Sequence, residues 1–432
     1  MLYIKAGTRM LQGQSNIRNS TFALFNTQLE EQFEISSYAA KMLRKAHNAG
    51  NIDSLLYNTK TKDFILELLE AGFIVEETST SASDDYTFLG TPIPHRYPLS
   101  NLSIELTNGC NLQCRHCYGS FPQLSKYEFV PFDWIKQSVD ELNALHVRKV
   151  ALTGGESTIH PHFLEIAMFF LEHGFELCVF TNGYNPEIIE KLLTKSHQYH
   201  FMIKVSLDGP EDVHNLIRGS KNSYLNTLKT LEAISSCSNV DLYISTVVMR
   251  QNITSLENVE NMIKAKFPKA VHTKDLAFPL GNACDCAFSL DELPLVDQLA
   301  PSLFLAHETG DLSEQRSAMQ KKIRCTGGIT QCTLMPSGFL KICNSACDEQ
   351  FYFKHNVFLK GIKFAWLNCG KKITKFRHEK AKQTPQCKNC QYVKDCRLND
   401  CRVLAWAYTN DASKSNPIAC YMQHKMNGGT KT

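Results

Sequence analysis

The sequence lacks the features of membrane, secreted and nucleic-acid-coating proteins. No apolar run approaches the roughly 20 residues that a membrane-spanning helix needs. The first residues also lack the basic-then-apolar pattern of a signal peptide. The formal net charge is only +3, which gives no strong attraction to phosphates or anionic membranes. We therefore expect a cytoplasmic protein whose partners include neither nucleic acid nor a membrane.

Cysteine is missing from the head of the chain. None occurs in the first 109 residues, three lie at 110–117, four lie between 178 and 286, and ten lie between 325 and 420. Because disulfides are disfavoured in the cytosol, 17 cysteines point to metal or cluster ligation. At 432 residues the chain exceeds one ordinary hydrophobic core, so we expect two or three domains.

The first cysteine group has the spacing C-x3-C-x2-C. It consists of Cys110, Cys114 and Cys117, and Tyr118 follows directly. Three thiolates at this spacing can hold one [4Fe-4S] cluster and leave its fourth iron without a protein ligand, so that an amino acid can chelate it through its amino and carboxylate groups. A structural zinc knuckle is the alternative explanation.

A second motif, Thr153-Gly154-Gly155-Glu156, follows about 35 residues later. The two glycines let the backbone come close to a ligand, and Glu156 can accept a hydrogen bond from a ligand ammonium group. An ordinary strand-to-helix turn would also explain the glycines. The order and spacing of the two motifs together resemble the radical S-adenosylmethionine (SAM) superfamily. The resemblance implies that SAM binds the open iron and that its reductive cleavage gives a 5′-deoxyadenosyl radical.

The middle of the chain predicts alternating strands and helices. Amphipathic helical patterns such as 132–145 and 222–235 separate six apolar, β-branched runs. These runs are 102–106, 149–153, 176–181, 201–207, 241–248 and 270–277. Repeated units of this kind favour parallel strands with right-handed crossovers. The resemblance implies an α/β fold with a partial (β/α)6 barrel, in which ligands bind at the carboxyl ends of the strands.

Further polar residues follow the third and fourth predicted strands. They are Asn182, Ser206 and Arg218. By resemblance, Ser206 and Arg218 contact the ribose and carboxylate of SAM, since a guanidinium suits a carboxylate through paired donors. A helix N-cap would explain Asn182 equally well, and a surface salt bridge would explain Arg218. The full set of predicted SAM contacts is Tyr118, Gly154, Gly155, Glu156, Asn182, Ser206 and Arg218.

The cysteines of the tail follow a regular spacing. Cys325 precedes a G-x4-C motif that ends at Cys343, and a C-x2-C-x5-C-x4-C run begins at Cys387. This pattern resembles the SPASM extension of radical SAM enzymes. One more residue than usual separates Cys396 from Cys401. The resemblance implies two auxiliary [4Fe-4S] clusters, and hence three clusters in all. The first would be held by Cys325, Cys332, Cys343 and Cys401, and the second by Cys387, Cys390, Cys396 and Cys420.

Four thiolates per auxiliary cluster would favour electron relay. If Cys332 is not a ligand, the first auxiliary cluster instead has a vacant site for a substrate thiolate. The alternative to two auxiliary clusters is a pair of zinc sites, which would use the same cysteines. Cys347 and Cys369 are left over, and we expect both to be buried structural cysteines. The basic run at 371–382 is either a solvated helix face or a surface for an acidic peptide.

The head of the chain indicates the kind of substrate. Strand-like pieces at 1–4 and 21–25 precede helical patterns at 37–49, 52–57 and 62–71. This order predicts a winged-helix-like domain and is similar to the peptide-recognition element of enzymes that modify ribosomally made peptides, which binds a leader as an added strand. We expect this domain at 1–76, a linker at 77–98, the barrel at 99–310 and the SPASM domain at 311–432.

The first functional hypothesis is a peptide maturase that forms a cross-link, most simply a thioether, in a precursor peptide with a leader segment. Flavodoxin or ferredoxin would donate electrons, and no side chain is assigned as a catalytic acid or base. Alternatives are a peptide epimerase, a carbon–carbon cross-linking enzyme, and a sulfatase-activating or cofactor-building enzyme. Asn344 stands where sulfatase-activating enzymes carry an aspartate, which counts against that class. A DNA-binding redox sensor would have no need for the Gly-Gly-Glu motif.

Overall fold

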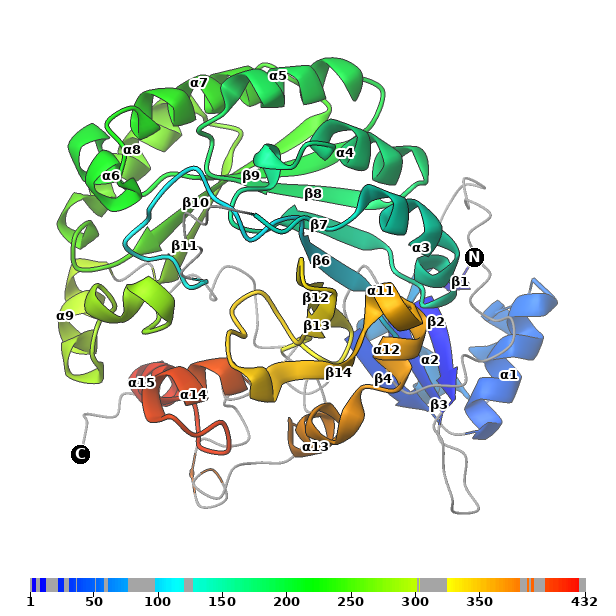
Figure 1. Cartoon of the computed structure of the whole chain (residues 1–432). Coiled ribbons are helices and arrows are strands. Elements are labelled where there is room, and N and C mark those ends of the chain that lie inside the picture. The colour runs from blue at the N-terminus through cyan, green and yellow to red at the C-terminus, as the bar shows by residue number, and fades with distance from the viewer. Residues whose placement is uncertain are drawn as a thin grey trace. The chain divides into compact units, whose positions relative to one another are not determined.

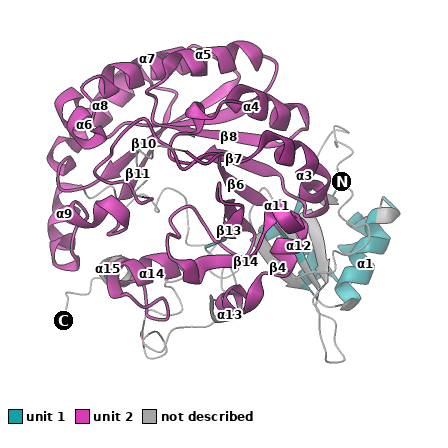
Figure 2. Ribbon diagram, viewed as in Figure 1, with its two compact units in different colours: residues 1–98, 308–326 teal, residues 99–307, 327–432 magenta. Residues whose placement is uncertain are grey.

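The chain forms two compact units (Figures 1 and 2). The computed structural model describes residues 2–4, 8–12, 22–26, 31–35, 37–50, 52–57, 61–76, 98–119, 127–300, 303, 325–380, 387, 390–391 and 401–426. One unit contains residues 1–98 and 308–326, and the other contains residues 99–307 and 327–432. The predicted linker lies outside the described residues, apart from residue 98. None of the described helices is long and apolar enough to cross a membrane.

The N-terminal unit combines two small antiparallel sheets with helices. Strands β2 (Thr8–Gln12), β3 (Phe22–Asn26) and β4 (Glu31–Ile35) pair in that order, and β1 (Leu2–Ile4) pairs with β5 (Ile74–Glu76). The helical segments are α1 (Ser37–Asn48), the 3-10 turn η1 (Ile52–Leu55) and α2 (Lys62–Glu70). Leu43 and Ile65 are fully buried in the core of this unit. The sequence predicted β1, β3 and the helical order, but not β2 or β4.

The second unit is built on six parallel strands, as the sequence predicted. They are β6 (Asn101–Glu105), β7 (Lys149–Thr153), β8 (Glu176–Thr181), β9 (Phe201–Ser206), β10 (Val240–Val248) and β11 (Val271–Leu276). Each strand pairs in parallel with the next in sequence. The unit therefore has the mixed α/β architecture with a parallel sheet that is typical of a radical SAM fold.

Helices separate the strands and cover one side of the sheet (Figure 1). They are α3 (Phe132–Ala144), α4 (Phe163–Glu172), α5 (Pro186–Lys195), α6 (Glu211–Arg218), α7 (Ser223–Ser235), α8 (Leu256–Lys266) and α9 (Leu293–Leu299). Along β10 the residues alternate between buried and partly exposed. The buried residues pack toward the helices, whereas the partly exposed Ser245 and Val247 line a cavity.

The tail extends the same sheet, which the sequence did not predict. Strand β12 (Gln331–Leu334) pairs in parallel with β6, so that Cys332 lies opposite Leu102. Strands β13 (Phe339–Lys341) and β14 (Tyr352–Asn356) add antiparallel strands beyond it. The tail helices are α11 (Val357–Lys360), α12 (Ile362–Leu367), α13 (Gly370–Lys380), α14 (Arg402–Thr409) and α15 (Pro417–Met426). Residues 327–432 therefore fall in one compact unit with the six parallel strands.

Candidate functional site

A cavity of about 1140 Å³ lies at the carboxyl ends of the parallel strands. Parallel strands end at the same edge of a sheet, so residues far apart in sequence meet there. All seven predicted SAM contacts line the cavity, together with the three cysteines of the first group. Asn344 and Ser345 from the tail line it as well. The structure thus brings together all ten predicted residues of the central site.

The cysteine loop is held by backbone contacts with the end of α6. The Arg115 N–H donates to the Ile217 carbonyl at 2.9 Å, and the Gln113 N–H donates to the Arg218 carbonyl at 3.3 Å. Burial raises the pKa of the Cys110 thiol to about 12, and burial also raises the pKa of Cys114. The thiols are therefore protonated without a metal, and binding one would release their protons.

The donor set fits an iron–sulfur cluster. Within the ranges that the structure describes, no three His, Cys, Asp or Glu side chains converge on a point that one metal ion could occupy. In an iron–sulfur cube each thiolate binds its own iron, so the three sulfurs need not converge on one point. The Arg218 guanidinium adds a buried Nε–H with no hydrogen-bond partner among the described residues, which suits an anionic group in the cavity.

The two glycines of the second motif allow close packing against the cysteine loop. Gly154 has φ +139°, and a Cβ there would lie 2.5 Å from the Thr107 carbonyl oxygen. A Cβ on Gly155 would overlap the carbonyl oxygen of Gly109 and lie 2.6 Å from its carbonyl carbon. The glycines therefore serve the contact between two protein loops, in addition to any approach to a ligand.

Glu156 is buried between the ends of β7 and β8. Its Oε1 accepts hydrogen bonds from the Thr158 hydroxyl at 2.7 Å and the Thr181 hydroxyl at 2.8 Å, and its Oε2 accepts one from the Asn182 N–H at 2.7 Å. Burial raises the pKa of Glu156, although these hydrogen bonds oppose the rise. The Thr158 N–H also donates to Oε1, so four donors of the protein already bond to this carboxylate. The sequence analysis expected the carboxylate to accept a hydrogen bond from a ligand ammonium group.

Asn182 connects the third strand to the cysteine loop. Its Nδ2 donates to Asn111 Oδ1 at 2.8 Å, and its Oδ1 accepts from the Tyr184 N–H at 2.9 Å. The residue that precedes α5 as its N-cap is Asn185. Asn182 therefore does not cap this helix, and its side chain instead faces the cavity and the loop.

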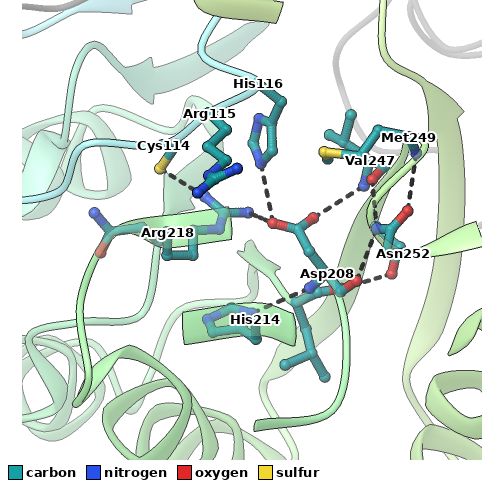
Figure 3. A network of polar contacts seen from close by, with 12 residues as sticks. Cys114, Arg115, His116, Asp208, His214, Arg218, Val247, Met249 and Asn252 are labelled. Atoms are coloured by element: carbon teal, nitrogen blue, oxygen red, sulfur yellow. Dashed lines mark hydrogen bonds and ion pairs between the residues drawn. The ribbon is translucent and has the colours of Figure 1, made fainter. Parts of the chain in front are cut away.

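Arg218 lies in a polar network whose centre, Asp208, the sequence analysis did not single out (Figure 3). Asp208 Oδ2 lies 2.7 Å from Arg218 Nη2 and 3.0 Å from His116 Nε2. Burial alone would raise the pKa of Asp208, but Arg218 and His116 hold it far below its ordinary value. The ion pair of Arg218 is thus buried and lies beside the site. The signal in the sequence that could have identified Asp208 is an acidic residue shortly after the end of a buried strand.

A second buried ion pair joins the end of β6 to the end of β13 in the tail. Lys341 Nζ lies 2.7 Å from Glu105 Oε1, and the two side chains are 5% and 3% exposed. Lys341 also donates to the Asn344 carbonyl and lies 5.9 Å from the centre of the Tyr118 ring. Burial raises the pKa of Tyr118 well above its ordinary value. These contacts fix a wall of the cavity and position Asn344 within it.

The predicted auxiliary ligands are only partly described. Cys396 lies outside the described residues, whereas the structure describes the other seven. Cys332 is fully buried in the sheet, and burial raises the pKa of its thiol. Of the two remaining tail cysteines, Cys369 is buried, as expected, but Cys347 is only partly buried and its sulfur contacts the Tyr118 carbonyl oxygen at 3.3 Å.

Comparisons with known proteins agree with this geometry. Residues 104–263 match the family model of the Radical SAM superfamily. The AdoMet-dependent heme synthase of Methanosarcina barkeri is 25% identical over 74% of this chain and 96% of its own length. The mycofactocin maturase MftC of Mycolicibacterium smegmatis is 33% identical over 36% of this chain and 39% of its own. The sporulation killing factor maturation protein SkfB of Bacillus subtilis is 27% identical over 46% of this chain and 47% of its own.

The fold similarity to one solved structure is more extensive. SuiB of Streptococcus suis, bound to S-adenosylmethionine, superposes with a TM-score of 0.64 at 15% sequence identity. The superposition covers 96% of this chain and 99% of SuiB. A second structure, SuiB bound to its precursor peptide SuiA, superposes with a TM-score of 0.62. At this identity the similarity establishes a shared fold.

Proposed function

We propose that this radical SAM enzyme modifies a ribosomally made precursor peptide and forms a cross-link in it, most simply a thioether. The observation that carries the proposal is the fold similarity to SuiB, which extends over 96% of the chain and therefore includes the N-terminal unit. SuiB has been solved with a precursor peptide bound. The maturases MftC and SkfB support the same class of substrate through their sequence similarity.

Cys110, Cys114 and Cys117 would hold the cluster, and the predicted SAM contacts surround it. When bound, the cluster and SAM supply a 5′-deoxyadenosyl radical that abstracts hydrogen from the substrate. The chain's own residues bind and orient: Asn182 and Glu156 fix the loops around the cavity, and Arg218 presents its Nε–H to a carboxylate.

The cavity continues beyond the predicted SAM contacts to polar residues that suit a peptide side chain or backbone. They are Gln251, Asp275, Asp285, Asn344 and Ser345. Asn344 Oδ1 accepts a hydrogen bond from the Thr333 hydroxyl at 2.7 Å, which fixes its amide at the cavity wall. An amide cannot take a proton as a carboxylate does, so we assign Asn344 to substrate orientation.

The tail and head would supply the remaining functions. Two auxiliary [4Fe-4S] clusters on the SPASM cysteines would accept the electron released when the cross-link closes, and flavodoxin or ferredoxin would reduce the first cluster. In the N-terminal unit, β2 and β4 are the edges of a three-stranded sheet. A leader segment can add to such an edge as a further strand. We place the reaction in the cytoplasm.

The test is an anaerobic incubation of the full-length protein with SAM, dithionite and any short cysteine-bearing peptide that a reading frame beside its gene encodes. We expect 5′-deoxyadenosine and a peptide that has lost two hydrogen atoms, as mass spectrometry would show. A peptide whose mass is unchanged in ordinary water, but which takes up one deuteron when the reaction is run in heavy water, would indicate epimerisation instead. Formation of 5′-deoxyadenosine with no change in the peptide would reject the peptide substrate.

A second candidate is a cofactor-building reaction. It is favoured by the similarity to the heme synthase, which spans nearly that whole protein. That alignment leaves a quarter of this chain unmatched, whereas the superposition on SuiB leaves 4%. The two candidates differ in their substrates, so incubation with a porphyrin precursor in place of the peptide distinguishes them.

A further inference from the structure

Asp208 connects three elements around the cysteine loop. It follows β9, and its Oδ2 contacts both Arg218 of α6 and His116 of the loop, as Figure 3 shows. Its Oδ1 accepts a hydrogen bond from the Val247 N–H at 3.1 Å, at the end of β10. Asp208 is 1% exposed, so solvent does not screen these contacts.

The same network reaches a predicted cluster ligand. Arg218 Nη1 donates to the sulfur of Cys114 at 3.6 Å, while its Nη2 is paired with Asp208. One guanidinium thus lies between a carboxylate and a cysteine sulfur. A positive charge and an N–H···S hydrogen bond at this sulfur favour the more negative, reduced state of a cluster, and a nearby carboxylate disfavours it.

We propose that Asp208 and Arg218 jointly set the reduction potential of the first cluster through their charges, the two residues acting in opposite directions. The inference rests on the proposed cluster at Cys110, Cys114 and Cys117. The positive charge of Arg218 raises the reduction potential, and the negative charge of Asp208 lowers it. Because the two charges cancel, the pair leaves the cluster at a low potential, at which it is strongly reducing. Reductive cleavage of SAM requires such a low potential, since one electron must pass from the reduced cluster to the sulfonium.

The side-chain contacts allow electrostatic and structural roles to be separated. In Asp208→Asn the Oδ1 atom remains available to accept from the Val247 N–H. The backbone of Asp208 is also bonded, to His214 Nδ1 and to the Asn252 amide, and the substitution leaves both bonds in place. What the variant removes is the negative charge beside Arg218, together with the Oδ2 atom that faces Arg218 and His116.

The experiment is a potentiometric titration of the anaerobically reconstituted full-length protein, with dithionite as the one-electron donor and electron paramagnetic resonance as the readout. The first cluster is identified in the wild type as the signal that SAM alters, and the same signal is then followed in the variants, because Arg218 is itself a predicted SAM contact. We expect R218Q to shift its midpoint to a more negative potential, D208N to shift it to a more positive one, and the double variant to lie between them. As a control, D212N removes an exposed carboxylate of α6 and leaves the midpoint unchanged.

A purely structural role for the network predicts another pattern. Both single variants would then lose iron or shift in the same direction, and either result would overturn the proposal, as would unshifted midpoints. If D208N does not fold, R218K decides the matter: it retains the charge, so its midpoint must lie between those of the wild type and R218Q. Equal midpoints for R218K and R218Q would overturn the proposal. Failure of the wild type to bind iron would instead reject the proposed function.

Discussion

Replacing Gly155 with alanine tests the close contact between the Gly-Gly-Glu loop and the cysteine loop. The new Cβ would overlap backbone atoms of Gly109, which cannot rotate away as a side chain can. Overpacking of this kind costs about 1–3 kcal/mol. The loops are also joined by hydrogen bonds from the Gly155 N–H to the Thr107 carbonyl and from the Glu156 N–H to the Gly109 carbonyl, both 2.9 Å. Losing both adds about 1 kcal/mol each.

We therefore expect G155A to lower the free energy of unfolding by about 3–5 kcal/mol and to impair iron binding. The assay is guanidinium denaturation of the metal-free full-length protein, followed by iron analysis after reconstitution. Gly174 provides a matched control, because it has φ +77° but a Cβ added there would have no atom within 4 Å. G174A should cost only about 1 kcal/mol. Equal losses for the two variants, with normal iron content, would refute the reasoning.

Two further predictions concern buried charges. K341M leaves Glu105 buried without its partner and should destabilise the protein by about 3–5 kcal/mol. In the same denaturation assay, the double variant K341M/E105L should recover most of that stability. No recovery in the double variant would argue against the ion pair. Burial and Arg218 hold the pKa of His214 at about 3, below its ordinary 6.5, so the unfolded chain takes up a proton first as pH falls. Between pH 6.5 and pH 4, the free energy of unfolding of the wild type should therefore fall by about 3 kcal/mol more than that of H214Q. H200Q, which replaces an exposed histidine, should lose as much stability as the wild type.

The sequence predicted the parallel strands because each one is a local apolar run whose order fixes its neighbours. It also predicted the residues at the strand ends, since parallel strands place those ends together. It did not predict that β12 pairs with β6, because this contact joins Cys332 to Leu102, which are distant in the chain. Non-local pairing of this kind leaves no local pattern.

Side-chain partners were predicted less well than positions. Glu156 lies at the predicted site, yet its hydrogen bonds go to Thr158, Thr181 and Asn182. Arg218 lines the cavity, but its ion pair with Asp208 depends on how α6 packs against β9. Residue type and spacing specify which groups meet at an edge, whereas the pairing among them depends on distances that only the folded chain defines.

The central claim is that Cys110, Cys114 and Cys117 hold the cluster at which SAM is cleaved. The most direct measurement is the yield of 5′-deoxyadenosine from anaerobically reconstituted wild type, C114A and C178A, each incubated with SAM and dithionite. Cys178 lies in β8 and is not among the residues that line the cavity, so C178A controls for the loss of a thiol. The wild type and C178A should form 5′-deoxyadenosine and C114A should form none. A C114A variant that forms it at the wild-type rate would contradict the account.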